Sequence, residues 1–208
     1  MHLNTQSVAE FDIVPSNLYV CSDKSRFMDI IIYGSRHGAA KRYAEGLAER
    51  TGIKAIDYSE VGGLGPYKRV IYMGAIYASG VTGLKKTMAK LLPNQELFVV
   101  TVGMVDPADQ AFIGPLREAL KKLIPPQLYD EKRIFHLRGA IDYGQLELKY
   151  RILMKMMYSQ AAKLPEEKLT SEFKAVLATY GKKVDYVDLE MLRPLTAAMA
   201  LSQEINTM

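Results

Sequence analysis

The sequence predicts an α/β domain with a doubly wound, five-stranded parallel sheet in the order 2-1-3-4-5 and helices on both faces. Three observations favour this fold. Runs of β-branched and aromatic residues recur along the chain, helical segments separate them, and several runs end in glycine. Strands that alternate with helices form right-handed βαβ units, and these units build a parallel sheet that is covered on both faces.

The composition indicates one folded domain. Hydrophobic residues make up 49% of the 208 residues and charged residues 24%, which suits a well-buried core. The net charge of +4 mildly favours anionic ligands or a lipid surface, and we expect no nucleic-acid partner. With Cys21 as the single cysteine and the three histidines far apart, a disulfide scaffold and a Cys-rich zinc site are excluded. We therefore expect no metal centre and a reducing, cytoplasmic location.

The first 27 residues differ from the rest of the chain. They are polar and non-periodic, and they lack the apolar segment of a signal peptide. Because Met28 directly precedes the first predicted strand, it is a candidate natural start. We therefore expect residues 1–27 to be an extension, not native if translation begins at Met28, and residues 28–208 to form the domain. In the alternative, residues 11–14 dock on the sheet as a short capping segment.

The first strand and helix are predicted from a change of period. Residues 30–33 are β-branched and aromatic, as is typical of a buried parallel strand. From Ala39 onward the apolar residues recur with helical spacing, and charged residues occupy the opposite face. The loop between them is bracketed by Gly34 and Gly38.

The second and third strands are predicted over residues 53–58, which alternate, and residues 69–74, which are apolar throughout. The glycine cluster at 62–65 precedes no helix, so we interpret it as a turn and not as a phosphate loop. Residues 75–83 are expected to form a small-residue loop, and residues 84–91 a basic helix.

The rest of the domain repeats the alternation of strand and helix. Everything after Gln145 is expected to be helical. The remaining predicted elements are a strand over 96–103, a loop and helix over 107–123 stopped by Pro125 and Pro126, a strand over 133–139, and helices over 145–158 and 188–203.

The predicted topology places a ligand site at one edge of the sheet. In such sheets a ligand lies outside the carboxyl ends of the strands, at the switch point between strands 1 and 3. Gly34, Gly74 and Gly103 end three neighbouring strands there. Loop N–H groups and the helix dipole converge near Gly38, which favours a phosphate. The first loop lacks the G-x-G-x-x-G spacing of dinucleotide sites, so a mononucleotide is favoured, and the alternative is an ordinary βα turn.

The first loop resembles the phosphate loop of the flavodoxin family, and the resemblance extends over residues 28–203. Flavodoxins bind the FMN phosphate on a loop patterned hydroxyl-x-hydroxyl-Gly-x-hydroxyl. Ser35 and Gly38 match that pattern, whereas His37 and Ala40 stand where hydroxyl residues are expected. The resemblance implies that FMN is the cofactor and that Arg36 and Lys41 supply charge in place of the missing hydroxyls. The implied phosphate-loop residues are Ser35, Arg36, His37, Gly38, Ala39, Ala40 and Lys41.

The chain is more closely similar to the flavodoxin branch that includes menaquinone-dependent protoporphyrinogen oxidase. Four stretches resemble that branch: Ser35-Arg36-His37-Gly38, Gly74-Ala75, Gly139-Ala140-Ile141-Asp142-Tyr143 and Arg151-Ile152-Leu153-Met154-Lys155-Met156-Met157. The resemblance implies oxidation of a flat substrate such as protoporphyrinogen, with a quinone as electron acceptor. Asp142 stands where the oxidase has a basic residue, so the resemblance does not decide the identity of the substrate. Electron transfer to a redox partner protein is the alternative function.

The second and third loops are expected to surround the flavin. Tyr77 is the candidate for stacking on the ring, and the alternative is that it packs on the next helix. Gly80 allows a peptide to flip toward the flavin, because glycine tolerates both conformers. Met104 covers the other ring face or belongs to the core. The implied contacts from these loops are Ala75, Ile76, Tyr77, Gly80, Gly103, Met104 and Asp106.

The chain offers no nucleophile and base with a supporting motif, so we assign no catalytic residue and interpret His136 as a hydrogen-bonded core histidine. Residues 146–158 alternate apolar and basic side chains, which predicts either peripheral contact with the inner face of a membrane or an ordinary core helix with one solvated side. The leading hypothesis is an FMN-binding redox protein. The alternative is an interaction protein that keeps the fold and has lost FMN.

Overall fold

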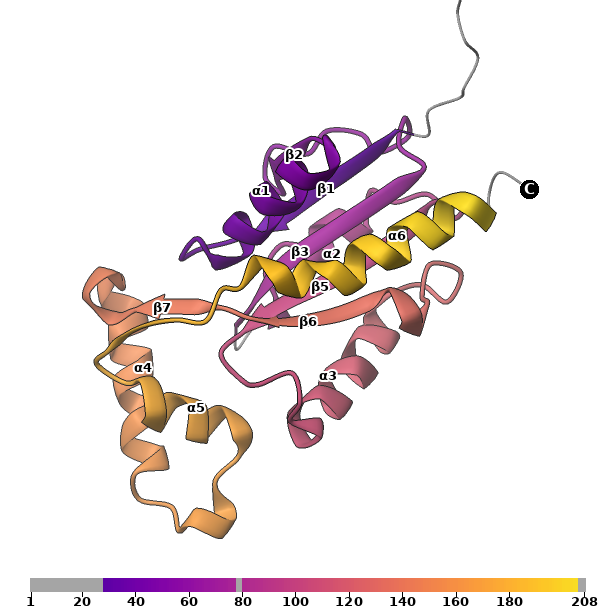
Figure 1. The fold of residues 1–208 in the computed structure, drawn as a ribbon. Helices are drawn as coiled ribbons and strands as arrows, with labels where there is room; N and C mark the ends of the chain where they lie inside the picture. Colours follow the sequence, from indigo (N-terminus) through magenta and orange to yellow (C-terminus); the bar gives the residue numbers. More distant parts are fainter. Residues whose placement is uncertain (1–27, 78–79, 206–208) are drawn as a thin grey trace, which may run out of the picture.

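A computed structural model describes residues 28–77 and 80–205 (Figure 1). Five parallel strands form the central sheet in the order β2-β1-β3-β5-β6, which confirms the predicted order of 2-1-3-4-5. These strands are β1 (Asp29–Gly34), β2 (Ala55–Asp57), β3 (Arg69–Tyr77), β5 (Glu96–Gly103) and β6 (Ile134–Arg138). The short strand β4 (Gly80–Val81) pairs antiparallel with the end of β3.

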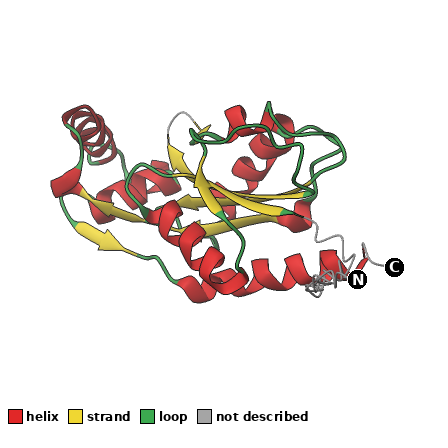
Figure 2. Ribbon diagram, turned by 90° about the horizontal axis from the view of Figure 1, so that it is seen from above, coloured by secondary structure: helices red, strands yellow, loops and turns green. Residues whose placement is uncertain are grey.

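Helices cover both faces of the sheet because alternate strand residues point to opposite sides. Ile31, Met73 and their neighbours pack against α1 (Ala39–Thr51) and α6 (Arg193–Ile205). Ile32, Tyr72 and their neighbours pack against α2 (Leu84–Met88) and α3 (Gln110–Leu123). The strands therefore form a middle layer between two apolar cores (Figure 2).

A buried group of charges joins the elements at the amino ends of the strands. Arg69 is 3% exposed, and its Nε lies 3.0 Å from a carboxylate oxygen of Glu96. Its Nη1 lies 3.6 Å from Asp29 and donates to the carbonyl oxygen of Met199 at 3.0 Å. Because a buried charge is costly unless it is paired, these contacts fix β1, β3, β5 and α6 relative to one another.

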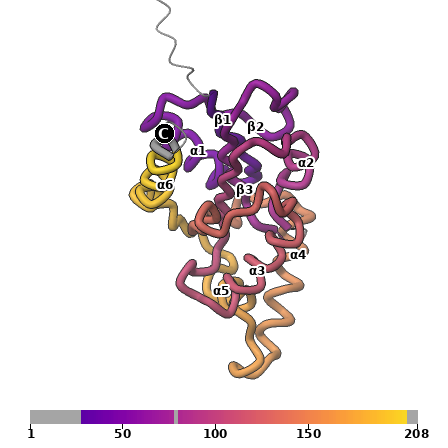
Figure 3. Tube along the Cα trace, turned by 90° about the vertical axis from the view of Figure 1, so that its right-hand side faces the viewer, coloured from indigo at the N-terminus to yellow at the C-terminus, as the bar shows by residue number. Residues whose placement is uncertain are grey.

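A helical excursion leaves the sheet after β6 and returns before α6. It is bounded by an antiparallel two-stranded ladder of β7 (Ala140–Asp142) and β8 (Lys183–Asp185). Between these strands lie α4 (Leu148–Ala161) and α5 (Ser171–Thr179), which contact each other away from the sheet (Figures 1 and 3). The single-turn 3-10 helices are η1 (Glu131–Arg133), η2 (Tyr143–Gln145), η3 (Glu166–Lys168) and η4 (Leu189–Leu192).

Two of the sequence expectations are wrong. Residues 75–83 do not form a simple loop, because β3 continues to Tyr77 and Gly80, with a φ of 99°, begins the returning strand β4. The chain after Gln145 is not all helical, because residues 183–185 pair with residues 140–142. The glycine cluster at 62–65 lies between β2 and β3 and precedes no helix, as expected. The proposed role of residues 1–27 lies outside the described residues and stays a prediction.

Candidate functional site

Two glycines, Gly34 and Gly38, determine the shape of the loop from β1 to α1. A Cβ at Gly34 would overlap the carbonyl oxygen of Thr82, the residue that follows β4, so β1 has to end in glycine at this point. Gly38 precedes α1 in the left-handed conformation, with a φ of 86°. Apart from its chain neighbours, no described residue has an atom within 4 Å of the place where its Cβ would stand. The loop therefore turns sharply and leaves open space at the helix N-terminus.

Polar groups at this turn lack protein partners. Helix α1 begins without a side-chain cap and has no acidic residue in its first turn. The Oγ of Ser35 is buried and has no hydrogen-bond partner among the described residues. An unsatisfied buried hydroxyl costs about 1–3 kcal/mol and calls for an explanation. A hydroxyl and a helix N-terminus together form a seat for an anion.

An aromatic cluster with Arg36 at its centre stands beside this seat. The ring centroid of Tyr77 lies 6.0 Å from that of His37 and 6.3 Å from that of Tyr150 on α4. The Arg36 guanidinium lies 5.5 Å from the Tyr77 ring centroid and 5.2 Å from that of Tyr150, and it donates to the Tyr150 hydroxyl. These cation–π contacts link the first loop, the end of β3 and α4.

The same surroundings keep two of these rings uncharged at neutral pH. Burial raises the pKa of Tyr77 to about 12, so its hydroxyl keeps its proton. Burial lowers the pKa of His37, and the adjacent Arg36 charge lowers it further. A neutral imidazole donates through one nitrogen and accepts through the other, so His37 can serve a polar ligand in either sense.

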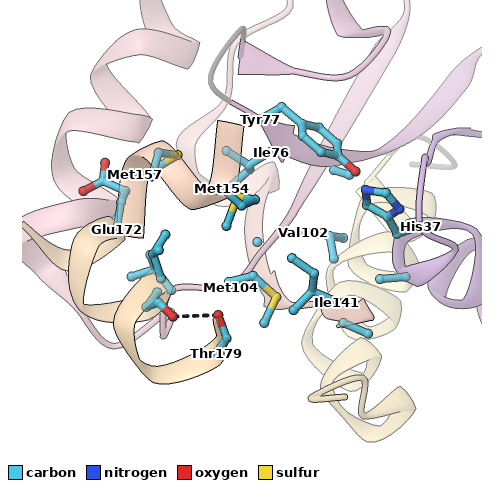
Figure 4. A pocket seen from close by; sticks show the side chains of 18 of the residues that line it. His37, Ile76, Tyr77, Val102, Met104, Ile141, Met154, Met157, Glu172 and Thr179 are labelled. Carbon is cyan, nitrogen blue, oxygen red and sulfur yellow. Dashed lines mark hydrogen bonds between the residues drawn. The ribbon is translucent and has the colours of Figure 1, made fainter. Parts of the chain in front are cut away.

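A largely apolar cavity of about 610 Å³ opens between the carboxyl edge of the sheet and the α4–α5 excursion. In Figure 4, Tyr77 and His37 lie together on one side, Met157 and Glu172 lie on the opposite side, and Met104 lies between them. This volume is within the range of small-molecule sites. The predicted residues that line it are Ser35, His37, Ala39, Ala75, Ile76, Tyr77, Gly103 and Met104.

Other predicted residues lie outside the cavity lining. Ala40 is fully buried in the core beneath α1, so its side chain has no access to a ligand. Lys41 is exposed and pairs with Glu45 at 3.6 Å, one helical turn along. Asp106 accepts a hydrogen bond from the N–H of Ala108 at 2.8 Å and lies 3.9 Å from Arg138. Arg36, Gly38 and Gly80 also stay outside the lining, although Arg36 contacts two lining rings.

Several lining residues were not predicted from the sequence. Tyr150, Leu153, Met154 and Met157 recur at helical spacing on α4, and that spacing is the signal that identifies a cavity-facing stripe. The residues from α3 and α5 gave no such signal, because only packing brings these helices to the cavity. They include Phe112, Phe173, Val176 and Thr179.

His136 differs from expectation in one respect. Its Nδ1 lies 2.7 Å from the Oγ1 of Thr101, but its Nε2 is buried without a partner among the described residues. Burial lowers the pKa of His136 to about 4. It lies on β6, outside the cavity lining, and belongs to the structural part of the molecule.

The amino-acid sequence that forms this site matches a known protein family. A family model described as a flavodoxin domain matches residues 30–168. The chain belongs to the flavodoxin domain family. The match begins in β1 of this flavodoxin domain and ends in η3, so it includes both the first loop and α4. No curated protein matches the chain.

Solved structures similar to this flavodoxin domain share little of its sequence. A protein of Bacteroides uniformis described as a flavoprotein is 12% identical, with 54% of this chain and 90% of that chain covered and a TM-score of 0.42. Oxidised flavodoxin 1 of Bacillus cereus is 17% identical, and the alignment covers 55% of this chain and 86% of that chain with a TM-score of 0.37. The flavodiiron core of a Synechocystis protein is 14% identical, and the alignment covers 55% of this chain and 31% of that chain with a TM-score of 0.37.

Proposed function

We propose that this protein is an FMN-binding redox protein. The observation that carries the proposal is the Oγ of Ser35, which has no partner within residues 28–77 and 80–205 and lies just before the N-terminus of α1, at the edge of an apolar cavity. A phosphate monoester satisfies the hydroxyl and the helix N-terminus together, and the cavity receives the attached ring system. When bound, FMN supplies the electron chemistry, and the protein supplies position and electrostatics.

Each part of the site has a role in holding this cofactor. Ser35 donates to the phosphate, and Arg36 offsets its charge from the cluster that it forms with Tyr77 and Tyr150. The neutral rings of Tyr77 and His37 flank the place where an aromatic ligand enters the cavity. An aromatic face disfavours the electron-rich reduced flavin, so Tyr77 lowers the reduction potential.

The far end of the cavity supports a second, flat ligand. Beyond Tyr77 the lining continues between α4 and α5, where Met154, Met157 and Phe173 supply an apolar wall. A flavoprotein that exchanges electrons only through an exposed ring edge has no need of this volume. We therefore favour quinone-linked oxidation of a flat substrate such as protoporphyrinogen over electron transfer to a redox partner protein, in a cytoplasmic setting.

The experiment that tests FMN binding compares two ligands that differ by the phosphate. Purified protein is titrated with FMN and with riboflavin, and quenching of flavin fluorescence reports binding. We expect FMN to bind at least tenfold more tightly, since a phosphate in a charge-assisted seat contributes about 1.5–3 kcal/mol per hydrogen bond. Failure to bind either flavin rejects the proposal and favours an interaction protein that keeps the fold without the cofactor.

A second assay separates the two redox roles. The FMN-loaded protein is mixed with protoporphyrinogen and a quinone, and porphyrin fluorescence is followed over time. Quinone-dependent formation of protoporphyrin supports the oxidase. Flavin that is reduced and reoxidised without substrate turnover supports a carrier, and the finer proposal then fails while FMN binding stands.

A further inference from the structure

Helix α4 has two apolar faces, and the residues in 28–77 and 80–205 cover only one of them. Tyr150, Met154 and Met157 line the cavity on the inner face. On the outer face, the exposed fractions are 70% for Leu148, 53% for Ile152 and 57% for Met156. The solvated side of this helix is therefore apolar along Leu148, Ile152 and Met156, whereas the solvated side of an amphipathic helix is usually polar.

The outer face forms a continuous stripe. With 3.6 residues per turn, residues at i, i+4 and i+8 follow one another along a single side of the helix. A shallow groove on this side is lined by Ile152 and Met156 together with Lys155, Ser159 and Gln160. Soluble monomers rarely leave such apolar surface uncovered, whereas single exposed hydrophobic residues are normal.

Basic residues border the stripe on both sides. Lys149 follows Leu148, and Lys155 precedes Met156, so the helical wheel places one lysine on each border. Lys155 makes no ion pair with any residue in 28–77 or 80–205 and is exposed. Lys149 is 64% exposed at its side chain and pairs with Glu147 at 2.7 Å. Such a surface is complementary to anionic groups above an apolar layer.

We propose that the outer face of α4 docks on an anionic membrane surface. Leu148, Ile152 and Met156 enter the interface between headgroups and acyl chains, and the two bordering lysines contact anionic headgroups. The position of α4 on the projecting excursion gives it access to a flat surface (Figures 1 and 3). A bilayer is favoured over a protein partner because an apolar stripe with a lysine on each border is typical of interfacial helices.

This docking goes beyond the proposed redox function and needs no flavin. Leu153 is 41% exposed and also lines the cavity, so the apolar surface continues from the outer stripe to the cavity. If the proposed oxidation of an apolar substrate holds, docking brings that cavity to the source of such molecules. Vesicle binding is measured on protein without flavin, so failure of docking and failure of FMN binding are separate results.

The test is flotation of the full chain with vesicles of phosphatidylcholine alone or mixed with phosphatidylglycerol. We expect binding to the mixed vesicles only, weakened by salt. The variant Leu148→Ser/Ile152→Ser/Met156→Ser is expected to lose about tenfold or more in partitioning. Lys149→Gln/Lys155→Gln is expected to lose about fivefold per lysine. These side chains point outward, and circular dichroism checks that each variant is folded.

The matched control replaces three other exposed leucines by serine, namely Leu92, Leu123 and Leu201, which are 44%, 39% and 60% exposed. This control is expected to bind as the wild type does. Absence of vesicle binding overturns the proposal, as does equal loss in the control and the stripe variant. Binding to uncharged vesicles that salt does not change also overturns it. In another outcome, the protein self-associates without binding vesicles, and Ile152→Ser abolishes that association. This result would assign the stripe to contact with a second copy of the chain and would also overturn the proposal of membrane docking.

Discussion

Replacing Ser35 by alanine should change ligand affinity and stability in opposite directions. In the protein without ligand, the buried Oγ has no partner among the described residues, so its removal eliminates an unsatisfied polar atom. Such an atom costs about 1–3 kcal/mol, and we therefore expect Ser35→Ala to leave the free energy of unfolding unchanged or to raise it by about 1 kcal/mol. When FMN is bound, we expect the same hydroxyl to donate to a charged phosphate.

The expected loss of FMN affinity follows from that hydrogen bond. A hydrogen bond to a charged group contributes about 1.5–3 kcal/mol, which corresponds to an increase of about 10- to 100-fold in Kd. Riboflavin has no phosphate, so its affinity should be unchanged. Fluorescence titrations give both Kd values, and urea unfolding without ligand gives the free energy of unfolding.

A matched control removes a hydroxyl that already has a partner. The Oγ of Ser59 donates to Asp57 at 2.6 Å in an exposed turn, so Ser59→Ala should leave both flavin affinities unchanged. Equal weakening of FMN and riboflavin binding by Ser35→Ala would exclude a hydrogen bond from this hydroxyl to the phosphate. A loss of more than about 1 kcal/mol in the unfolding free energy of the protein without ligand would show that the hydroxyl has a structural role instead.

Three further predictions concern other parts of the molecule. The change Tyr77→Leu should raise the reduction potential of bound FMN, because the aromatic face of tyrosine disfavours the reduced flavin ring. A dye-equilibrated titration measures this potential. An unchanged potential would place Tyr77 away from the flavin. The change Arg69→Met should destabilise the fold by about 3–5 kcal/mol in urea, because it leaves Glu96 and Asp29 buried without this partner, while the riboflavin Kd of the folded protein stays the same. Burial lowers the pKa of His136 to about 4 in the folded state, so the folded protein binds this proton less readily than the unfolded chain does. The free energy of unfolding should therefore fall as the pH drops from about 6.5 toward 4. In His136→Gln this part of the pH dependence should disappear, and an unaltered slope of stability against pH would contradict the assigned pKa.

The central sheet was predictable because its strands carry their own signal. Residues 30–32 and 97–100 are buried on both faces of the sheet and are apolar without interruption, and the helices between the strands fix a parallel order. The return of β4 onto β3 was not predictable, because residues 75–83 are small and lack alternation. That pairing depends on Thr82, which donates its N–H to Ala75 at 2.9 Å and accepts from the Tyr72 hydroxyl. Strand β8 has only three residues, too few for a period.

The site was predictable only as far as topology determines it. The rule that ligands lie at the carboxyl edge identified the first loop, and the structure places Ser35 and Tyr77 at one cavity there. The same rule says nothing of α5, whose Phe173 and Val176 reach the cavity through packing between helices. Whether the Ser35 hydroxyl has a partner also depends on distances between atoms, which residue types do not encode.

We therefore expect stability and ligand binding to depend on different ends of the sheet. At the amino ends of the strands, Arg69 and its partners are buried and paired, and they join three strands to α6. At the carboxyl ends, the Ser35 hydroxyl has no partner in the part of the chain that the structure describes, and Arg36 is exposed and connects to α4 through Tyr150. Polar groups left unsatisfied within a folded domain cost stability and are kept where a ligand repays that cost. Changes near Arg69 should consequently alter unfolding and leave ligand affinity alone, and changes near Ser35 should do the reverse.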